Sequence, residues 1–210
     1  YYAKWVPSSV QEGSWGDINW RIDSAGELLF TPMNGRTATL NGWGTNVSQT
    51  TWYPYRDSIK SFRIAANSEI TMLRDTGTLY QMFKDYKALE KVDFTGLGTA
   101  NATSMQEMFA GCPLLSSVTF NSKQLASDNK YRFEVSQSTS FRGMFQNCTS
   151  LGTVDVTMFE TPQLTNMAYM FAGCTSLENM DLSKFNTTIV TTMEGLFDGA
   201  SKLIKFDMHH

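Results

Sequence analysis

Residues 170–182, M-F-A-G-C-T-S-L-E-N-M-D-L, decide how this chain folds, because the pattern occurs five times. In each copy a Phe is followed at fixed offsets by a Cys or its substitute, a Leu, and a triplet that alternates between apolar and polar. The five Phe residues are spaced 26, 36, 26 and 26 residues apart, at Phe83, Phe109, Phe145, Phe171 and Phe197. A fixed period in this range is typical of a solenoid, in which each repeat stacks on its neighbours.

Each repeat contains signals for one helical turn and one strand. Another large apolar residue precedes the Phe by four positions, as Met167 precedes Phe171, which places both side chains on one face of a helical turn. Gly173 can end that turn, and the triplet at residues 180–182 alternates as a short strand does. We therefore predict an α/β, right-handed solenoid of about five coils, with short parallel strands on one side and short helical turns on the other.

Residues 1–58 differ from the repeats and contain all five tryptophans: Trp5, Trp15, Trp20, Trp43 and Trp52. Residues 19–23 and 27–31, joined by a Ser-Ala-Gly turn, are predicted to form a β-hairpin. Residues 33–51, rich in Gly, Asn and Thr, are predicted to be a loop. Because a terminal coil has an apolar face without a neighbour, we expect residues 1–58 to be an aromatic N-terminal β cap with the tryptophans in its core. Residues 59–210 are then the solenoid, which we expect to be cut at its C-terminal end inside a longer array.

The repeat F-x-x-C-x-x-L-x-x-[VM]-x-[VFL] with its M-F-x-G-C core resembles the BspA-like leucine-rich-repeat proteins. The forms M-F-A-G-C-T-S-L and M-D-L-S-K-F resemble the branch found in Gram-positive bacteria, and the leader W-Y-P-Y-R-D-S-I-K-S-F at residues 52–62 is similar to the segment before the repeats there. Tyr86 and Ala200 depart from the pattern, since they stand where the other repeats have Cys. The resemblance spans nearly the whole chain. It implies a leucine-rich-repeat solenoid from a cell-surface or secreted protein, and an adhesin-type module that binds a host matrix protein or another surface ligand.

Several function classes are disfavoured by composition. The net charge of −3 suggests no general nucleic-acid partner, and no apolar run approaches the roughly 18 residues of a membrane span. No histidine precedes His209, which removes Ser/His/Asp and Cys/His nucleophilic schemes. We therefore expect a non-enzymatic monomer without a cofactor, whose partner is a host or bacterial surface protein, or a glycan.

Three cysteines, Cys112, Cys148 and Cys174, occupy one repeat position. An odd number in register indicates a buried ladder of small apolar side chains. Oxidation between neighbouring coils is the alternative, and zinc is disfavoured because no further ligand lies nearby in the sequence.

The outward positions of the predicted strands form the first candidate binding surface. Aspartates recur at one such position, where adjacent strands lie about 4.8 Å apart, so a column of like charges needs cations or hydrogen-bond donors. One interpretation is an acidic, hydroxyl-rich face that receives a basic ligand or weakly holds Ca²⁺; the other is a solvated face that prevents aggregation. The candidate ligand-binding residues on this face are Lys91, Asp93, Thr119, Asp155 and Asp181.

The third repeat is longer by ten residues, which fall within residues 121–140. Insertions in repeats map to loops, often on the binding face, and aromatic and Arg side chains are typical anchors of protein contacts. The alternative is that Phe133 and Val135 fold back and fill a gap. The candidate anchors in this insertion are Lys123, Lys130, Tyr131, Arg132 and Phe133.

Two rival functions remain open. The array could be a spacer or stalk that displays other domains and has no ligand of its own. The tryptophan-rich cap could bind carbohydrate, which requires at least one Trp lying flat in a groove.

Overall fold

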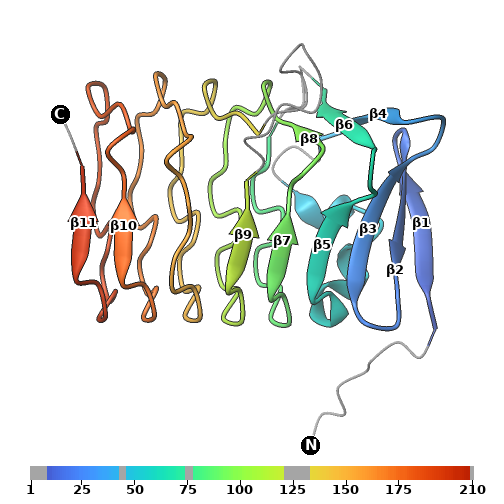
Figure 1. Cartoon of the computed structure of the whole chain (residues 1–210), viewed down its shortest axis with the longest axis horizontal. Coiled ribbons are helices and arrows are strands. Elements are labelled where there is room, and N and C mark those ends of the chain that lie inside the picture. Colours follow the sequence, from blue (N-terminus) through green and yellow to red (C-terminus); the bar gives the residue numbers. More distant parts are fainter. Residues whose placement is uncertain (1–8, 43–45, 74–77, 121–132, 209–210) are drawn as a thin grey trace, which may run out of the picture.

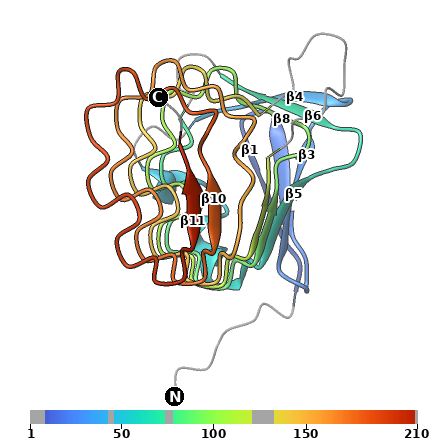
Figure 2. The ribbon, with the colours of Figure 1, turned by 60° about the vertical axis from the view of Figure 1, so that its left-hand side comes forward.

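A computed structural model describes residues 9–42, 46–73, 78–120 and 133–208. Within them the chain winds into stacked coils that run from the N-terminal strands to β11 (Figure 1). Figure 2, turned by 60°, shows the coils superimposed on one another with the strands along one side. The predicted solenoid of about five coils is confirmed.

The N-terminal strands extend the solenoid sheet and cover its first coil. β1 (Gln11–Trp15), β2 (Ile18–Ile22) and β3 (Glu27–Pro32) are antiparallel, which confirms the predicted hairpin. The sheet then continues in parallel through β5 (Ser61–Ile64), β7 (Lys91–Asp93) and β9 (Ser117–Thr119). Its order, β1-β2-β3-β5-β7-β9, makes the cap and the first two coils one sheet.

A second, parallel sheet was not expected. β4 (Thr37–Leu40), β6 (Glu69–Met72) and β8 (Leu97–Gly98) pair in that order, so residues 33–51 are not all loop. Two short 3-10 helices follow β4, η1 (Val47–Gln49) and η2 (Tyr53–Ser58). β4 has the sequence Thr-Ala-Thr-Leu, and its Leu40 side chain is fully buried in the core. The Thr residues suit a strand because they are β-branched.

The predicted helical turns are wrong, because the segments around the repeat Phe residues are runs of β-turns. In the fourth coil, alternate N–H groups donate to the carbonyl three residues back. Tyr169 and Gly173, two residues before and after Phe171, have φ values of 58° and 73°. A positive φ at the third residue is the mark of type II turns, which therefore begin at Met167 and Phe171. The same two positions have positive φ in every coil.

The other N–H groups of each turn segment bond to the next coil. We call these segments, residues 79–86, 105–112, 141–148, 167–174 and 193–200, the turn row. The Phe N–H donates across each junction, at 2.8–2.9 Å, in the pairs Phe83–Met108, Phe109–Met144, Phe145–Met170 and Phe171–Leu196. Turn bonds and coil-to-coil bonds together satisfy the backbone without a helix.

The core repeats with the same regularity. The rings of Phe83, Phe109, Phe145, Phe171 and Phe197 stack at centroid distances of 5.3–5.7 Å with interplanar angles of at most 12°. Beside them the three cysteines are free and buried, which confirms the apolar ladder. Each thiol donates to the carbonyl of the preceding coil's Phe at 2.9–3.2 Å. Burial raises the pKa of the Cys112 and Cys174 thiols to about 12, so both stay protonated.

The strands are less continuous than the turns. β10 (Asn179–Asp181) and β11 (Lys205–Asp207) form a separate parallel pair. Between β9 and β10, residues 154–156 of the third coil belong to no strand. Within the described residues, the N–H groups of Val154, Asp155 and Val156 donate no backbone hydrogen bond. The sheet is therefore interrupted where the turn row is not.

Candidate interaction surface

The outward side chains of β1–β3, β5, β7, β9, residues 153–157, β10 and β11 form one surface, here called the strand face. It contains the five sequence-predicted residues Lys91, Asp93, Thr119, Asp155 and Asp181, all exposed or half-buried. The predicted register is confirmed where strands pair, since Asp93 lies beside Thr119 and Asp181 beside Asp207.

Three of the described aspartates on this face also have a local role. Asp93 Oδ1 accepts from the Thr95 N–H at 2.9 Å, and Asp181 Oδ1 accepts from the Ser183 N–H at 2.9 Å. Asp155 Oδ1 accepts from both the N–H and the hydroxyl of Thr157, at 3.0 and 2.6 Å. These Asx turns end the strands. They supply part of the hydrogen bonding that a column of carboxylates requires.

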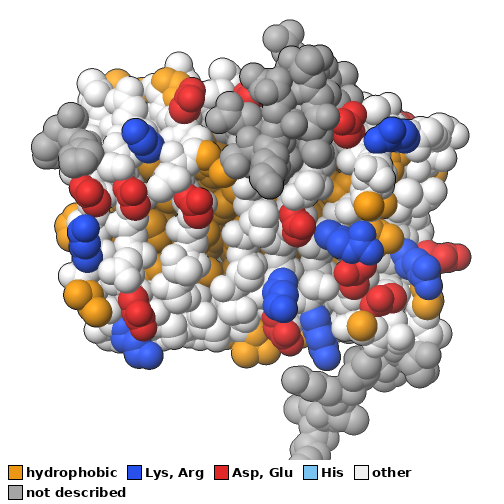
Figure 3. Space-filling model, viewed as in Figure 1, with side chains coloured by type: hydrophobic (Ala, Val, Ile, Leu, Met, Phe, Trp, Pro, Cys, Tyr) orange, Lys and Arg blue, Asp and Glu red, His pale blue; other side chains and the backbone are white. Residues whose placement is uncertain are grey.

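Over the last three coils the strand face is hollowed. A shallow groove of about 450 Å³ is bordered by three carboxylates and a single Lys, with Thr and Asn between them. Figure 3 shows the corresponding row of acidic side chains over β10, β11 and the neighbouring coil. The charged residues of this groove are Asp155, Asp181, Asp207 and Lys205.

At the cap end two further grooves carry cations and carboxylates in equal number. One groove, of about 720 Å³, lies over β1–β3 and includes Glu12 and Arg21, which face each other across the β1–β2 pair. A second, of about 430 Å³, is bordered by Arg36 and Arg63 and by the carboxylates of Glu69 and Asp93. Arg63 also forms an ion pair with Glu27 at 2.8 Å. Sequence reasoning missed both grooves, because they depend on how the cap joins the first coil.

The prediction that Phe133 in the insertion anchors a ligand is wrong. Its side chain is 1% exposed and packs against Phe94, Phe120 and Phe159 at centroid distances of 4.7–6.0 Å. Val135 is buried as well. Phe133 is therefore a core residue and cannot be a surface anchor, because its ring fills the gap that the longer repeat creates. Lys123, Lys130, Tyr131 and Arg132 lie outside the described residues.

The described tryptophans belong to the core of the cap, as expected. Trp52 is fully buried between Trp15 and Phe30. Trp20 borders the groove over β1–β3, but it is only 4% exposed, because the Gly13 backbone covers its ring. Trp20 Nε1 donates to Thr51 Oγ1 at 2.6 Å. None of these rings lies open as a platform for a sugar.

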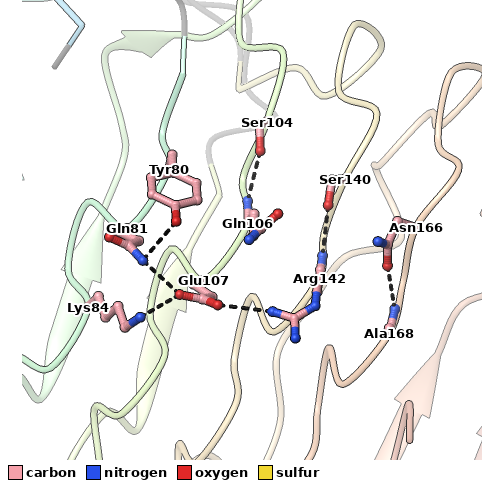
Figure 4. Close-up of polar contacts among 10 residues, drawn as sticks. All are labelled: Tyr80, Gln81, Lys84, Ser104, Gln106, Glu107, Ser140, Arg142, Asn166 and Ala168. Atoms are coloured by element: carbon pink, nitrogen blue, oxygen red, sulfur yellow. Dashed lines mark hydrogen bonds and ion pairs between the residues drawn. The ribbon is translucent and has the colours of Figure 1, made fainter. Parts of the chain in front are cut away.

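A polar network on the turn row was missed by sequence reasoning (Figure 4). Glu107 lies at its centre, with a side chain that is 13% exposed. It accepts from Gln81 Nε2 at 2.7 Å, forms an ion pair with Lys84 Nζ at 2.5 Å, and forms another with Arg142 Nη1 at 3.1 Å. Arg142 also lies over the ring of Tyr169, 5.7 Å from its centroid. One carboxylate thus links the first three coils.

The electrostatics of Glu107 follow from these contacts. Burial alone would raise its pKa, but hydrogen bonds from Lys84 and Gln81 and the charges of Lys84 and Arg142 outweigh burial and lower the pKa below its ordinary value. Glu107 is therefore ionised, and its ion pairs connect neighbouring coils. The only signal in the sequence was its position two residues before Phe109, where other coils have Gly or an uncharged residue.

Small polar residues start each turn segment, a second regularity that was missed. Five residues before the repeat Phe, a side-chain oxygen accepts from the N–H two residues on, at 2.9–3.4 Å (Figure 4). The residues at this position are Thr78, Ser104, Ser140, Asn166 and Thr192. Such side-chain bonds favour turns over helix.

The described residues contain no group of three or more His, Cys, Asp or Glu that could hold a metal ion. In the same part of the chain, no helix has the length and apolar character needed to cross a membrane.

Comparisons with known proteins give a family. No curated protein matches the chain. Among solved structures, a leucine-rich repeat protein from Eubacterium ventriosum ATCC 27560 is similar, at 14% identity and a TM-score of 0.30, over 95% of this chain and 85% of that one. A family model described as "Mycoplasma protein of unknown function, DUF285" matches residues 72–119 and 115–208, which is more than half of the chain. The chain therefore belongs to the DUF285 family.

Proposed function

We propose that this chain is a non-enzymatic, extracellular recognition module of a bacterial surface protein, which binds a host matrix protein or another surface protein across its strand face. The resemblance of its M-F-x-G-C repeats to BspA-like proteins of Gram-positive bacteria supports the location and the adhesin-type role. The structure supports the choice of surface, because repeat solenoids commonly bind through extended faces.

The observation that carries the proposal is the fixed orientation of the polar groups on the strand face. The carboxylates of Asp93, Asp155 and Asp181 are each held by a backbone N–H two residues away. A side chain that is already ordered loses less entropy when a partner binds it. A row of such groups, in the first, third and fourth coils, suits a protein ligand better than a small molecule.

The charge pattern indicates how the ligand would lie. Three carboxylates and one Lys border the groove over the last coils, whereas the cap-end grooves balance their Arg residues with Glu and Asp. A ligand with a basic segment over the last coils would match the acidic groove there. Such binding weakens as salt rises.

Binding to an array of matrix proteins, surface proteins and glycans tests the proposal. Asp93→Asn, Asp155→Asn and Asp181→Asn are combined in one variant, because Asn keeps the oxygen that accepts the turn hydrogen bond and removes only the charge. The matched control is Asp85→Asn with Lys87→Gln, an ion pair on the turn row. A second variant changes Lys130, Tyr131 and Arg132 to Ala and leaves Phe133 in the core.

We expect a protein ligand whose affinity falls at least about tenfold in the triple Asn variant and is unchanged in the control. Loss only in the insertion variant would move the site to residues 121–132. Binding that survives every variant would contradict the strand face as the site.

The spacer remains the second candidate, because one observation favours it. Every described aspartate in the outward row has a part in a turn or a strand pair, so folding alone accounts for their positions. Absence of binding to every protein and glycan in the array would support the spacer.

A further inference from the structure

The strand segment of the third coil, residues 153–157, leaves backbone hydrogen bonds unmade on both of its sides. In the paired coils, the residue eleven positions after the repeat Phe donates its N–H to the next coil, as Phe94 does at 3.0 Å and Leu182 at 2.7 Å. The equivalent N–H groups of Phe120 and Val156 have no backbone acceptor among the described residues. Figure 1 shows this part of the third coil between β9 and β10 without a strand.

The segment is nevertheless in place to pair with β10. Just before it, the Gly152 carbonyl accepts from the Glu178 N–H of the next coil at 3.2 Å. Its inward side chains, Val154 and Val156, are 7% and 1% exposed, so they remain in the core. Alternate residues of a strand direct their backbone groups to the same neighbour, so both valines face β10. Because unmade hydrogen bonds in buried residues cost free energy, another interaction must oppose the pairing.

Charge distinguishes the paired junctions of the strand face from the unpaired ones. The outward side chains of each parallel pair of strands include a Lys or Arg. At the two unpaired junctions, the described outward side chains include Asp155 and Asp181 and no cation. The cations of the paired strands are Arg63, Lys91 and Lys205. Two of them lie eight positions after the repeat Phe, where the third coil has Thr153.

Pairing would place Asp155 directly beside Asp181. Adjacent strands lie about 4.8 Å apart, and like charges at directly opposed positions are destabilising. The pair of β10 and β11 has the same arrangement of carboxylates, since Asp181 lies beside Asp207, but it also has Lys205 beside Asn179. The third coil lacks a cation at that offset, so repulsion between its Asp155 and Asp181 opposes the approach of the segment to β10.

We infer that residues 153–157 form a charge-dependent gap in the sheet, which closes onto β10 when a cation is supplied beside Asp155 and Asp181. Closing completes the backbone hydrogen bonds of Val154 and Val156. The groove of about 450 Å³ lies over this gap. A Lys or Arg side chain of a bound protein would therefore close the sheet as it binds, a consequence that rests on the proposed function, whereas the gap itself does not.

Amide hydrogen exchange by NMR at neutral pH and low ionic strength tests the gap. Thr153→Lys supplies the cation from the chain itself, at the offset of Lys91 and Lys205. Asp155→Asn removes one of the two charges and keeps the oxygen that accepts the turn hydrogen bonds. Leu114→Lys is the control, because it adds the same charge at a 45% exposed position away from the strand face.

The wild-type chain is also measured with tetralysine, the probe for a basic ligand. Thermal unfolding of each variant shows that it is folded, and each exchange rate is corrected for the intrinsic effect of neighbouring side chains.

We expect the amides of Val154 and Val156 to exchange at least about fivefold more slowly in Thr153→Lys and in Asp155→Asn than in the wild-type chain. The Leu114→Lys control stays within about twofold of wild type. Tetralysine slows the same two amides in the wild-type chain, and high salt removes its effect.

Unchanged exchange in both folded variants would overturn the inference, and so would an equal slowing in Leu114→Lys, since net charge would then account for it. Slowing in the two variants without any effect of tetralysine would support the gap and contradict only a basic ligand in the groove.

Discussion

The two long sides of the solenoid hold neighbouring coils together in different ways. On the turn row, every junction from the first coil to the fifth has backbone hydrogen bonds and a stacked pair of Phe rings. On the strand side, pairing stops after β9 and resumes only at β10 and β11. The longer third repeat interrupts the sheet, yet the bond from Phe109 to Met144 across the same junction is intact at 2.9 Å.

This difference shows which part of the repeat is under the stricter geometric constraint. A turn segment with two residues of positive φ per coil fits its neighbour only in one register, because each free N–H must reach the next carbonyl. A short outward strand can lose its partners and remain solvated. We conclude that the turn row is the side on which hydrogen bonding between coils is continuous, and that the strand side tolerates an interruption.

The largest contrast is expected between two buried side chains of the third coil. Phe145→Ala removes a ring from the middle of the stack and should lower the free energy of unfolding by about 3–5 kcal/mol. Val154→Ala, on the interrupted strand side of the same coil, should cost about 1–2 kcal/mol. Urea unfolding measures both. Equal costs would remove the distinction between the two sides.

Two glycines test the turn geometry itself. Gly173→Ala places a Cβ at a φ of 73° and against Asn147 Oδ1, so it should destabilise the protein by about 1–2 kcal/mol. Gly152→Ala is the matched control, because its Cβ would meet nothing closer than 3.7 Å and its φ is not positive. Its effect should stay within about 0.5 kcal/mol. A harmless Gly173→Ala would show that the turns do not require the left-handed conformation.

Glu107 tests the network that links the first three coils. Because its pKa is lowered in the folded protein, its charge contributes stability at neutral pH, and the contribution is lost as pH falls below the ordinary glutamate value of 4.5 and through the folded value. Glu107→Gln should therefore cost about 1 kcal/mol at pH 7, and the difference from wild type should shrink in acid.

Unfolding experiments between pH 7 and pH 3 measure that difference. Glu178→Gln, at an exposed position beside β10, is the control and should show little change at any pH. A constant difference for Glu107→Gln across the range would mean that packing, and not charge, accounts for its effect.

The smallest change in the free energy of unfolding is expected for a substitution on the strand face. Asp155→Ala removes the acceptor for two donors of Thr157 and should cost about 0.5 kcal/mol, because the site is exposed. Asp155→Asn keeps the acceptor and should restore most of that loss. If Asn were as destabilising as Ala, the charge of Asp155, and not its turn, would matter for folding.

The sequence predicted the solenoid and the cysteine ladder, because both depend only on which residues recur at a fixed offset. It predicted the hairpin from two short strand-like segments joined by a Ser-Ala-Gly turn. It did not predict the turn type, since an apolar pair four residues apart fits both a helical turn and consecutive β-turns. The better signal was the Gly recurring two residues before or after the Phe, as in Gly143 and Gly173, where positive φ is required.

The site was predicted less well, for two physical reasons. An aromatic residue in an insertion can be an anchor or a core residue, and only the packing of Phe133 decided that it fills the interior. The Glu107 network joins Lys84 and Arg142, residues far apart in the sequence, and it forms only because the turn row brings consecutive coils together.

Native-state hydrogen exchange tests the central claim most directly. The amides of Phe109, Phe145 and Phe171, which bond to the next coil, should exchange only on global unfolding. The amides of Val154 and Val156 should exchange far faster, because they have no backbone acceptor in the part of the chain that the structure describes. We predict this result because hydrogen bonding between coils is continuous along the turn row. Equal protection of the third-coil strand amides, or faster exchange along the turn row, would contradict it.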